Sequence, residues 1–184
     1  MTVNYFFKNI QIIEGSNSTL KKETVLIQDG VIKSFGKKAL QSAELLGIKP
    51  NNAKRMLLAP CLVDPHSFLE SPFIGKEENI NSLIKKAALA GYGQIGVLPR
   101  SHLWRDQIES IISLKTINSD VLFHLWGGFS LSGQGVTLSK HDELLENGAI
   151  GLADDDFMPP IEILKQGFLV GDMKKSPVLI APRD

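Results

Sequence analysis

The sequence predicts an α/β protein in which a small antiparallel β-rich unit precedes a parallel sheet. From residue 56 onward, apolar runs of strand length alternate with segments of helical periodicity, which is the pattern of parallel βαβ units. Before residue 56, the apolar runs are separated by short polar turns, which indicates antiparallel strands. We therefore expect two domains, residues 1–55 and residues 56–184.

The first domain is expected to hold three strands and a short helix. Three runs rich in β-branched and aromatic side chains are the expected strands, at residues 5–13, 23–28 and 31–36. Asp29 and Gly30 stand between the last two runs and are a strong signal for a two-residue hairpin turn. Residues 40–46 favour a helix that stops at Gly47.

The second domain is organised around residues 57–70. Residues 56–63 read as a buried strand that is apolar on both faces, and the strand leads directly to His66. Because a parallel strand presents ligand-binding side chains at its carboxyl end, we expect a site at His66. Cys61 lies inside the apolar run, which predicts a buried thiol in a reducing compartment.

Four more strands and four helices are expected after this stretch. The strands are predicted at residues 94–99, 121–126, 148–153 and 177–181. The helices are predicted at residues 80–90, 104–117, 139–146 and 159–169, with Ser139 as an N-cap. This periodicity leaves both a doubly wound sheet and a (β/α) barrel open. A complete eightfold barrel needs about 250 residues, so in a barrel we expect the missing part from a longer chain or a partner.

Composition narrows the class of protein. Twenty basic and twenty acidic residues give a net charge of zero, with no block of like charges, so nucleic acid and anionic membranes are not expected partners. The N-terminus has no signal-peptide pattern, and no apolar stretch reaches the length of about 18 residues that a membrane span needs. We expect a cytoplasmic protein.

Four segments carry a resemblance to a known family. They are residues 59–66 (APCLVDPH), 87–99 (AALAGYGQIGVLP), 148–155 (GAIGLADD) and 177–184 (PVLIAPRD). In order and spacing they resemble the amidohydrolase superfamily, and specifically its dihydroorotases. The resemblance implies a small β-sandwich followed by the N-terminal portion of a TIM-type (β/α) barrel, with about five βα strands in this chain. It also implies a cyclic amide hydrolase of pyrimidine biosynthesis, in which zinc activates a water molecule.

The resemblance carries functional positions onto this chain one at a time. The first barrel strand of the family ends in two histidines separated by one residue, and here these positions are His66 and Phe68. A substrate-binding arginine corresponds to Glu70, which has the opposite charge, and a substrate-binding asparagine corresponds to Arg100.

Two further family positions lie at the ends of later strands. A metal-binding histidine corresponds to Ala181. The family's acid after the fourth strand survives as Asp154 or Asp155, so Asp154 remains a metal and catalytic candidate. From the run 154–156 alone, a solvated loop or an acid cluster at a helix N-terminus is favoured over a cation site.

These substitutions predict a degenerate site that binds zinc weakly or not at all, because zinc sites have at least three protein ligands. We expect a structural or regulatory homologue without catalysis, with aspartate transcarbamoylase or a second copy of this chain as partner. The alternative is an active zinc-dependent dihydroorotase whose remaining ligands lie beyond residue 184. The other three histidines, His102, His124 and His141, are expected at surface or packing positions. The two tryptophans, Trp104 and Trp126, are expected to pack.

Overall fold

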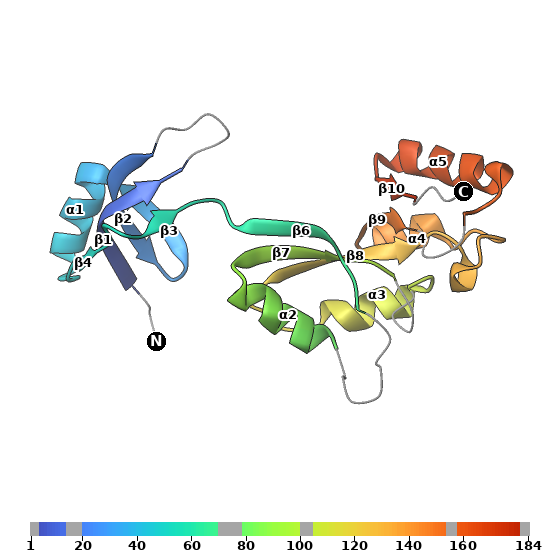
Figure 1. The fold of residues 1–184 in the computed structure, drawn as a ribbon, viewed down its shortest axis with the longest axis horizontal. Helices are drawn as coiled ribbons and strands as arrows, with labels where there is room; N and C mark the ends of the chain where they lie inside the picture. Colours follow the sequence, from blue (N-terminus) through green and yellow to red (C-terminus); the bar gives the residue numbers. More distant parts are fainter. Residues whose placement is uncertain (1–3, 14–19, 70–78, 100–104, 154–157, 181–184) are drawn as a thin grey trace. The chain divides into compact units, whose positions relative to one another are not determined.

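The computed structural model describes residues 4–13, 20–69, 79–99, 105–153 and 158–180. The chain divides into two compact units, Met1–Pro60 and Cys61–Asp184 (Figure 1). The division falls after Pro60 rather than after residue 55, because strand β5 (Leu57–Leu58) pairs with β1 (Asn4–Ile12) of the first unit.

The first unit is a mixed sheet with one helix. Besides β1 and β5 it contains β2 (Lys21–Gln28), β3 (Val31–Phe35) and β4 (Asn51–Asn52), in the order β3-β2-β1-β4 with β5 also beside β1. The pairs β1–β2 and β2–β3 are antiparallel, whereas β4 and β5 run parallel to β1. The expected antiparallel sandwich is thus, among the described residues, a single mixed sheet, because the chain returns from the helix to the second edge of β1.

Local turn chemistry explains the hairpin and the helix of this unit. Asp29 and Gly30 both have positive φ angles, 50° and 75°, as the predicted two-residue turn requires. Helix α1 (Gly36–Leu45) begins earlier than predicted, and its buried Ala39 and Ala43 pack against strand residues of the sheet. The helix ends before Gly47, as predicted, where φ is 64°.

The second unit is a five-stranded parallel sheet. Its strands are β6 (Leu62–Ser67), β7 (Tyr92–Val97), β8 (Leu122–Gly128), β9 (Ala149–Ala153) and β10 (Val178–Leu179). Neighbouring strands follow chain order, β10-β9-β8-β7-β6, and every pair is parallel. A doubly wound sheet reverses its strand order at a switch point, whereas a (β/α) barrel does not. The unit is therefore part of a barrel, which the sequence alone left open.

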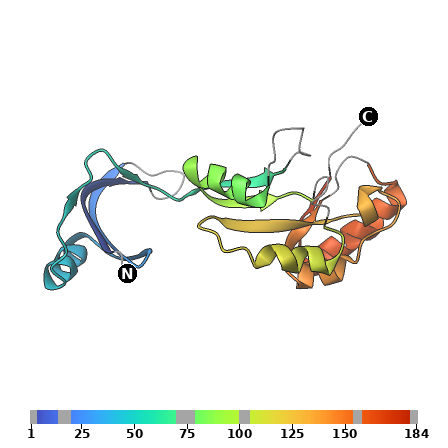
Figure 2. The same ribbon diagram turned by 90° about the horizontal axis from the view of Figure 1, so that it is seen from below.

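Helices cover one face of this sheet. They are α2 (Ile80–Leu89), α3 (Ile108–Lys115), α4 (His141–Glu146) and α5 (Ile161–Lys174), and their alternation with the strands can be followed by colour in Figures 1 and 2. Buried side chains of the four helices share one core with strand residues such as Ile95, Val97 and Leu125. Because side chains alternate along a strand, Gln94, Gly96, His124 and Trp126 face the opposite side, the inner face of the barrel.

The start of α2 was predicted correctly from the sequence, whereas the start of α4 was not. Asn79 caps α2: its Oδ1 accepts a hydrogen bond from the Ser82 amide at 2.9 Å, and the Ser82 hydroxyl accepts one from the Asn79 amide at 3.0 Å. The predicted N-cap at Ser139 is wrong, because α4 begins at His141 and the Ser139 hydroxyl donates instead to the Gly128 carbonyl. Tertiary contact with the end of β8 outcompetes local capping.

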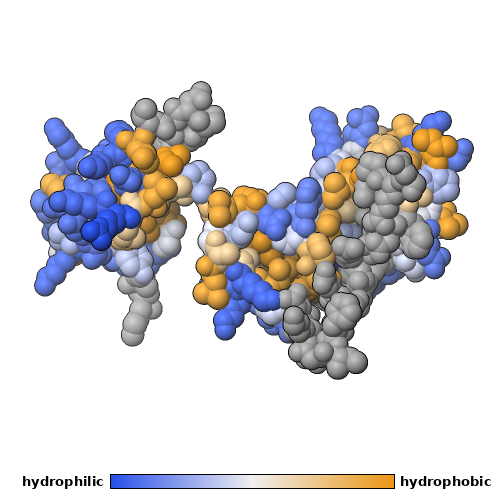
Figure 3. Space-filling view, viewed as in Figure 1, coloured by the Kyte–Doolittle hydropathy of each residue, from blue (hydrophilic) through white to orange (hydrophobic). Residues whose placement is uncertain are grey.

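The predicted buried strand at residues 56–63 is the main correction. The chain passes from β5 in one sheet to β6 in another, and β6 is the last strand of its sheet, with β7 as its only described neighbour. Leu62 and Val63 are therefore 55% and 56% exposed. Figure 3 shows apolar residues at the surface of each unit. Cys61, expected to be buried, is exposed.

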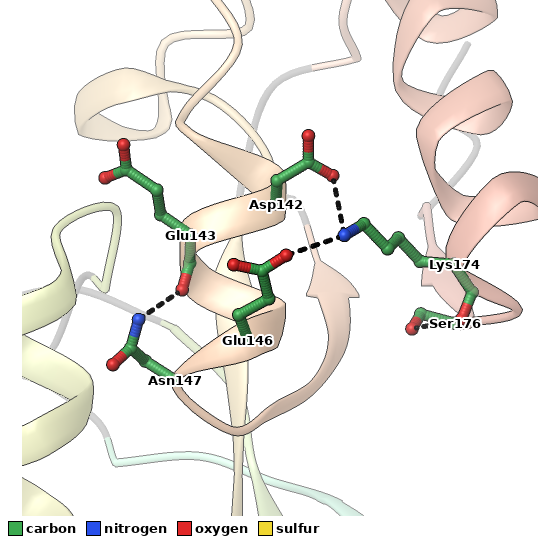
Figure 4. A network of polar contacts seen from close by, with 6 residues as sticks. All are labelled: Asp142, Glu143, Glu146, Asn147, Lys174 and Ser176. Carbon is green, nitrogen blue, oxygen red and sulfur yellow. Dashed lines mark hydrogen bonds and ion pairs between the residues drawn. The ribbon is translucent and has the colours of Figure 1, made fainter.

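Helices α4 and α5 are joined at their surface by a small ion-pair network (Figure 4). Lys174 Nζ lies 2.8 Å from Glu146 Oε1 and 3.6 Å from Asp142 Oδ1. The hydrogen bond from Lys174 lowers the pKa of the Glu146 carboxyl below its usual value.

In the described part of the chain, no helix combines the length and apolar character needed to cross a membrane.

Candidate functional site

His66 lies next to the last residue of β6, at the carboxyl end of the sheet. Asp64 shapes this strand end: its Oδ1 accepts the His66 amide hydrogen at 3.0 Å, and its Oδ2 accepts the Ser67 hydroxyl hydrogen at 2.8 Å. The His66 side chain is exposed. Its imidazole is therefore available to a ligand, while the backbone beneath it is held by a local carboxylate.

The second position of the family pair is also described. Phe68 follows β6 and is 38% exposed. Its phenyl ring has no lone pair to offer a metal ion. Eight residues named in the sequence analysis lie outside the described residues. Those from the family positions and the acidic run are Glu70, Arg100, Asp154, Asp155, Asp156 and Ala181. The other two, expected at surface or packing positions, are His102 and Trp104.

The described donors do not fit a zinc site. Among residues 4–13, 20–69, 79–99, 105–153 and 158–180, no three His, Cys, Asp or Glu side chains form a group that could hold a metal ion. Asp64 lies two residues before His66, but its carboxylate is already engaged by the Ser67 hydroxyl and the His66 amide. Zinc binding therefore stays a prediction from the resemblance.

Trp126 occupies the inner face of the sheet beside His66. It is 6% exposed, which confirms the predicted packing role, and its Nε1–H donates to the Pro65 carbonyl at 2.9 Å. Two glycines make room for the indole: a Cβ at Gly96 would lie 3.1 Å from Nε1, and a Cβ at Gly151 would lie 2.7 Å from Cζ3. The ring centroids of Trp126 and His66 are 6.2 Å apart.

Arg105 is a site residue that sequence reasoning missed. Its side chain is fully buried, its Nε–H donates to the Trp126 carbonyl at 2.9 Å, and its Nη2–H donates to the Val97 carbonyl. The Arg105 carbonyl accepts the Gly128 amide hydrogen at 2.6 Å. Burial lowers the pKa of Arg105 to about 9, so the guanidinium is charged at neutral pH. Nothing local in the sequence marks it, because its partners lie on two separate strands.

The two remaining described histidines have ordinary structural roles, as predicted. His124 Nε2 lies 3.0 Å from Gln94 Oε1 on the inner face. His141 is 4% exposed, and its Nε2–H donates to the Phe129 carbonyl at 2.7 Å, while its Nδ1 has no hydrogen-bond partner among the described residues. Burial lowers the pKa of His141, against the opposing effects of the Phe129 carbonyl and Asp142.

Comparison with known proteins links this arrangement to one family. No family model matches the chain. The dihydroorotase of Geobacter sp. (strain M21) is 29% identical over 157 residues, which cover 83% of this chain and 36% of that protein. The dihydroorotase of Elusimicrobium minutum is 26% identical over 184 residues, which cover 97% of this chain and 41% of that protein. A probable dihydroorotase-like protein of Synechocystis sp. is 25% identical over 153 residues.

Solved structures share the fold. A D-hydantoinase (dihydropyrimidinase) from Thermus sp. superposes with a TM-score of 0.66 at 18% identity, covering 96% of this chain and 39% of that chain. An N-acyl-D-glutamate deacylase from Bordetella bronchiseptica, solved with zinc and a phosphonate inhibitor, superposes with a TM-score of 0.63 at 12% identity. These likenesses confirm the predicted α/β fold, with a partial barrel after a β-rich unit.

The matched region is restricted to one part of the relatives. The chain spans 36% to 41% of the length of the two dihydroorotases described above. On the strength of the sequence matches and the shared fold, this chain is a homologue of the dihydroorotases of the amidohydrolase superfamily and corresponds to an N-terminal part of them.

Proposed function

We propose that this protein is a dihydroorotase-like scaffold that has lost cyclic amide hydrolysis and acts by binding, as a structural or regulatory homologue. The observation that carries the proposal is the end of β6, where exposed His66 is followed two positions later by Phe68. Alternate residues of a strand point the same way, so a histidine at each position could share one ion. One imidazole and one phenyl ring cannot do this.

The charges predicted around the site support the same proposal. Glu70 stands where the family carries an arginine for the substrate carboxylate, and like charges repel. The anionic substrate is therefore less favoured than in a site with the family's arginine.

The proposed action is association with another protein in the cytoplasm. By the family resemblance, the proposed partners are aspartate transcarbamoylase or a second copy of this chain. Co-purification with each candidate, followed by size-exclusion chromatography coupled to light scattering, tests this part. A protein that remains monomeric and binds neither candidate would remove the proposed binding role.

Metal content and turnover, measured on one preparation, test the loss of catalysis. We expect substoichiometric zinc and no ureidosuccinate formed from dihydroorotate above the rate without protein. Stoichiometric zinc together with turnover that disappears in His66→Ala would overturn the proposal. His124→Ala is the matched control, because His124 lies on a neighbouring strand and pairs with Gln94 instead.

A restoring substitution sharpens this test. Phe68→His rebuilds the alternating pair with His66, so we expect it to raise zinc affinity by at least tenfold, which is the usual order for a supporting interaction at a metal site. Val63→His places an imidazole at an exposed position of the same strand, three residues from His66, and should leave the affinity unchanged. Equal zinc affinities for the two variants would show that position 68 is not the lost ligand position.

The second candidate function is an active zinc-dependent dihydroorotase whose remaining ligands lie beyond residue 184. The observation that favours it is the match to proteins named dihydroorotase, one of them over 97% of this chain. The same preparation decides between the two candidates, since only this one predicts zinc-dependent turnover that is lost in His66→Ala.

A further inference from the structure

Three strand ends beside His66 are joined by side chains rather than by ladder hydrogen bonds alone. The Trp126 indole reaches from β8 across β7 and donates to the Pro65 carbonyl of β6 at 2.9 Å. The Arg105 guanidinium donates to the Trp126 carbonyl of β8 and to the Val97 carbonyl of β7. A continuous set of hydrogen bonds therefore links β6, β8 and β7 through two side chains.

Both side chains are held firmly. Arg105 is fully buried and Trp126 is 6% exposed. The indole lies between Gly96 and Gly151, whose missing Cβ atoms leave the space that the ring fills. The Gly128 amide closes the arrangement by donating to the Arg105 carbonyl at 2.6 Å. A buried, fully packed hydrogen-bonding side chain has few alternative rotamers, so its partners are held in one place.

We propose that Arg105 and Trp126 form a metal-independent clamp that fixes the carboxyl ends of β6, β7 and β8 and thereby positions His66. The inference rests on the proposed function, since a site without a metal ion needs other contacts to hold its strand ends. Trp126 acts on His66 through the Pro65 carbonyl, one residue earlier in β6, so it is a positioning residue.

Hydrogen exchange in the full chain tests the clamp directly. Trp126→Phe keeps an aromatic ring and removes the N–H donor. The Leu98 amide, which donates to the Ser67 carbonyl at 2.8 Å beside the clamp, should then exchange about 3- to 10-fold faster, the effect of one lost hydrogen bond. In the wild type, the Trp126 indole N–H should be protected, and a chelator should change neither signal.

The His66 ring signals provide a readout that general loosening of the fold would not give. In Arg105→Lys, which leaves the Trp126 ring and its ring current in place, the His66 ring resonances should shift while those of His141, which is bonded to Phe129, stay in place. Gln94→Leu is the matched control, because it removes the neighbouring hydrogen bond to His124 on the same face without touching the clamp. It should leave both Leu98 exchange and the His66 signals unchanged.

A second variant keeps the charge. Arg105→Lys retains a cation, but a single ammonium group cannot reproduce the fixed geometry of the guanidinium between two strands, so Leu98 exchange should again increase. Unchanged Leu98 exchange in Trp126→Phe, or unchanged His66 signals in Arg105→Lys, would overturn the clamp. Faster exchange after chelation of wild-type protein would overturn its independence from metal. Zinc-dependent turnover would instead overturn the proposed function, whichever way the exchange results fall.

Discussion

We expect Gly96→Ala to destabilise the second unit by shifting β6 away from β7. A Cβ at Gly96 would lie 2.5 Å from the Pro65 carbonyl oxygen and 3.0 Å from the Pro65 carbonyl carbon. Carbon and oxygen atoms pack at about 3.3 Å or more, so the Pro65 backbone would have to retreat by about 0.8 Å. That carbonyl also accepts the Trp126 indole hydrogen bond, which the movement would stretch.

The magnitude follows from these two effects. Overpacking of a well-packed region costs about 1–3 kcal/mol, and a lost hydrogen bond costs about 1 kcal/mol. We therefore expect a loss of about 2–4 kcal/mol in the free energy of unfolding. In urea denaturation followed by circular dichroism, this corresponds to a midpoint lowered by about 1–2 M.

A second glycine of the same sheet is the matched control. A Cβ at Gly127 meets only side-chain atoms, the nearest being Leu144 Cδ1 at 3.2 Å and Leu152 Cδ2 at 3.3 Å. Because side-chain ends can move by a few tenths of an ångström, Gly127→Ala should cost less than about 1 kcal/mol. Equal midpoints for the two variants, or a Gly96→Ala protein as stable as the wild type, would refute the close approach of β6 and β7.

Three further predictions concern the helices of the second unit and one exposed control residue. Burial lowers the pKa of His141 from its ordinary value of 6.5, so the unfolded chain binds the proton more readily and the free energy of unfolding falls as pH drops below 6.5. In urea denaturation, His141→Gln should therefore lose less stability than the wild type between pH 7.5 and 5. Equal losses would contradict this prediction. Leu144→Ala, at a fully buried position, should cost about 2–5 kcal/mol, whereas Leu45→Ala, 89% exposed, should cost less than about 0.5 kcal/mol, and a reversed order would contradict the core assignment. Lys174→Met removes only the exposed ion pairs to Asp142 and Glu146 and should not measurably shift the urea midpoint; a shift as large as that of Leu144→Ala would contradict their weak role.

Locally encoded features were predictable from the sequence. The helix expected at residues 80–90 is α2 (Ile80–Leu89), and the hairpin expected at Asp29 and Gly30 has the required positive φ angles. Each depends on side chains within a few positions of one another, so periodicity and turn chemistry suffice. The predicted N-cap at Ser139 failed for the complementary reason, because its hydroxyl is engaged by the Gly128 carbonyl of a neighbouring strand.

The candidate site was predictable only in part. The expected position of His66 at the carboxyl end of a parallel strand follows from the order of apolar and polar residues along β6. The burial of Arg105 and the hydrogen bond from Trp126 to Pro65 were not predictable, because the bond from Trp126 joins residues 61 positions apart. A buried arginine before a helix has the same sequence pattern as an exposed one until the strands around it are placed.

The sequence by itself determined the alternation of strands and helices and the chemistry available at each family position, since a phenyl ring at Phe68 cannot bind a metal ion in any fold. Only the tertiary structure decided between a doubly wound sheet and a barrel. It also decided that apolar residues of β6 are exposed to solvent, and that Arg105 and Trp126 lie at the ends of the strands. The physical reason is that propensity and periodicity act over a few residues, whereas strand order and burial depend on which strand edges pair across the whole unit.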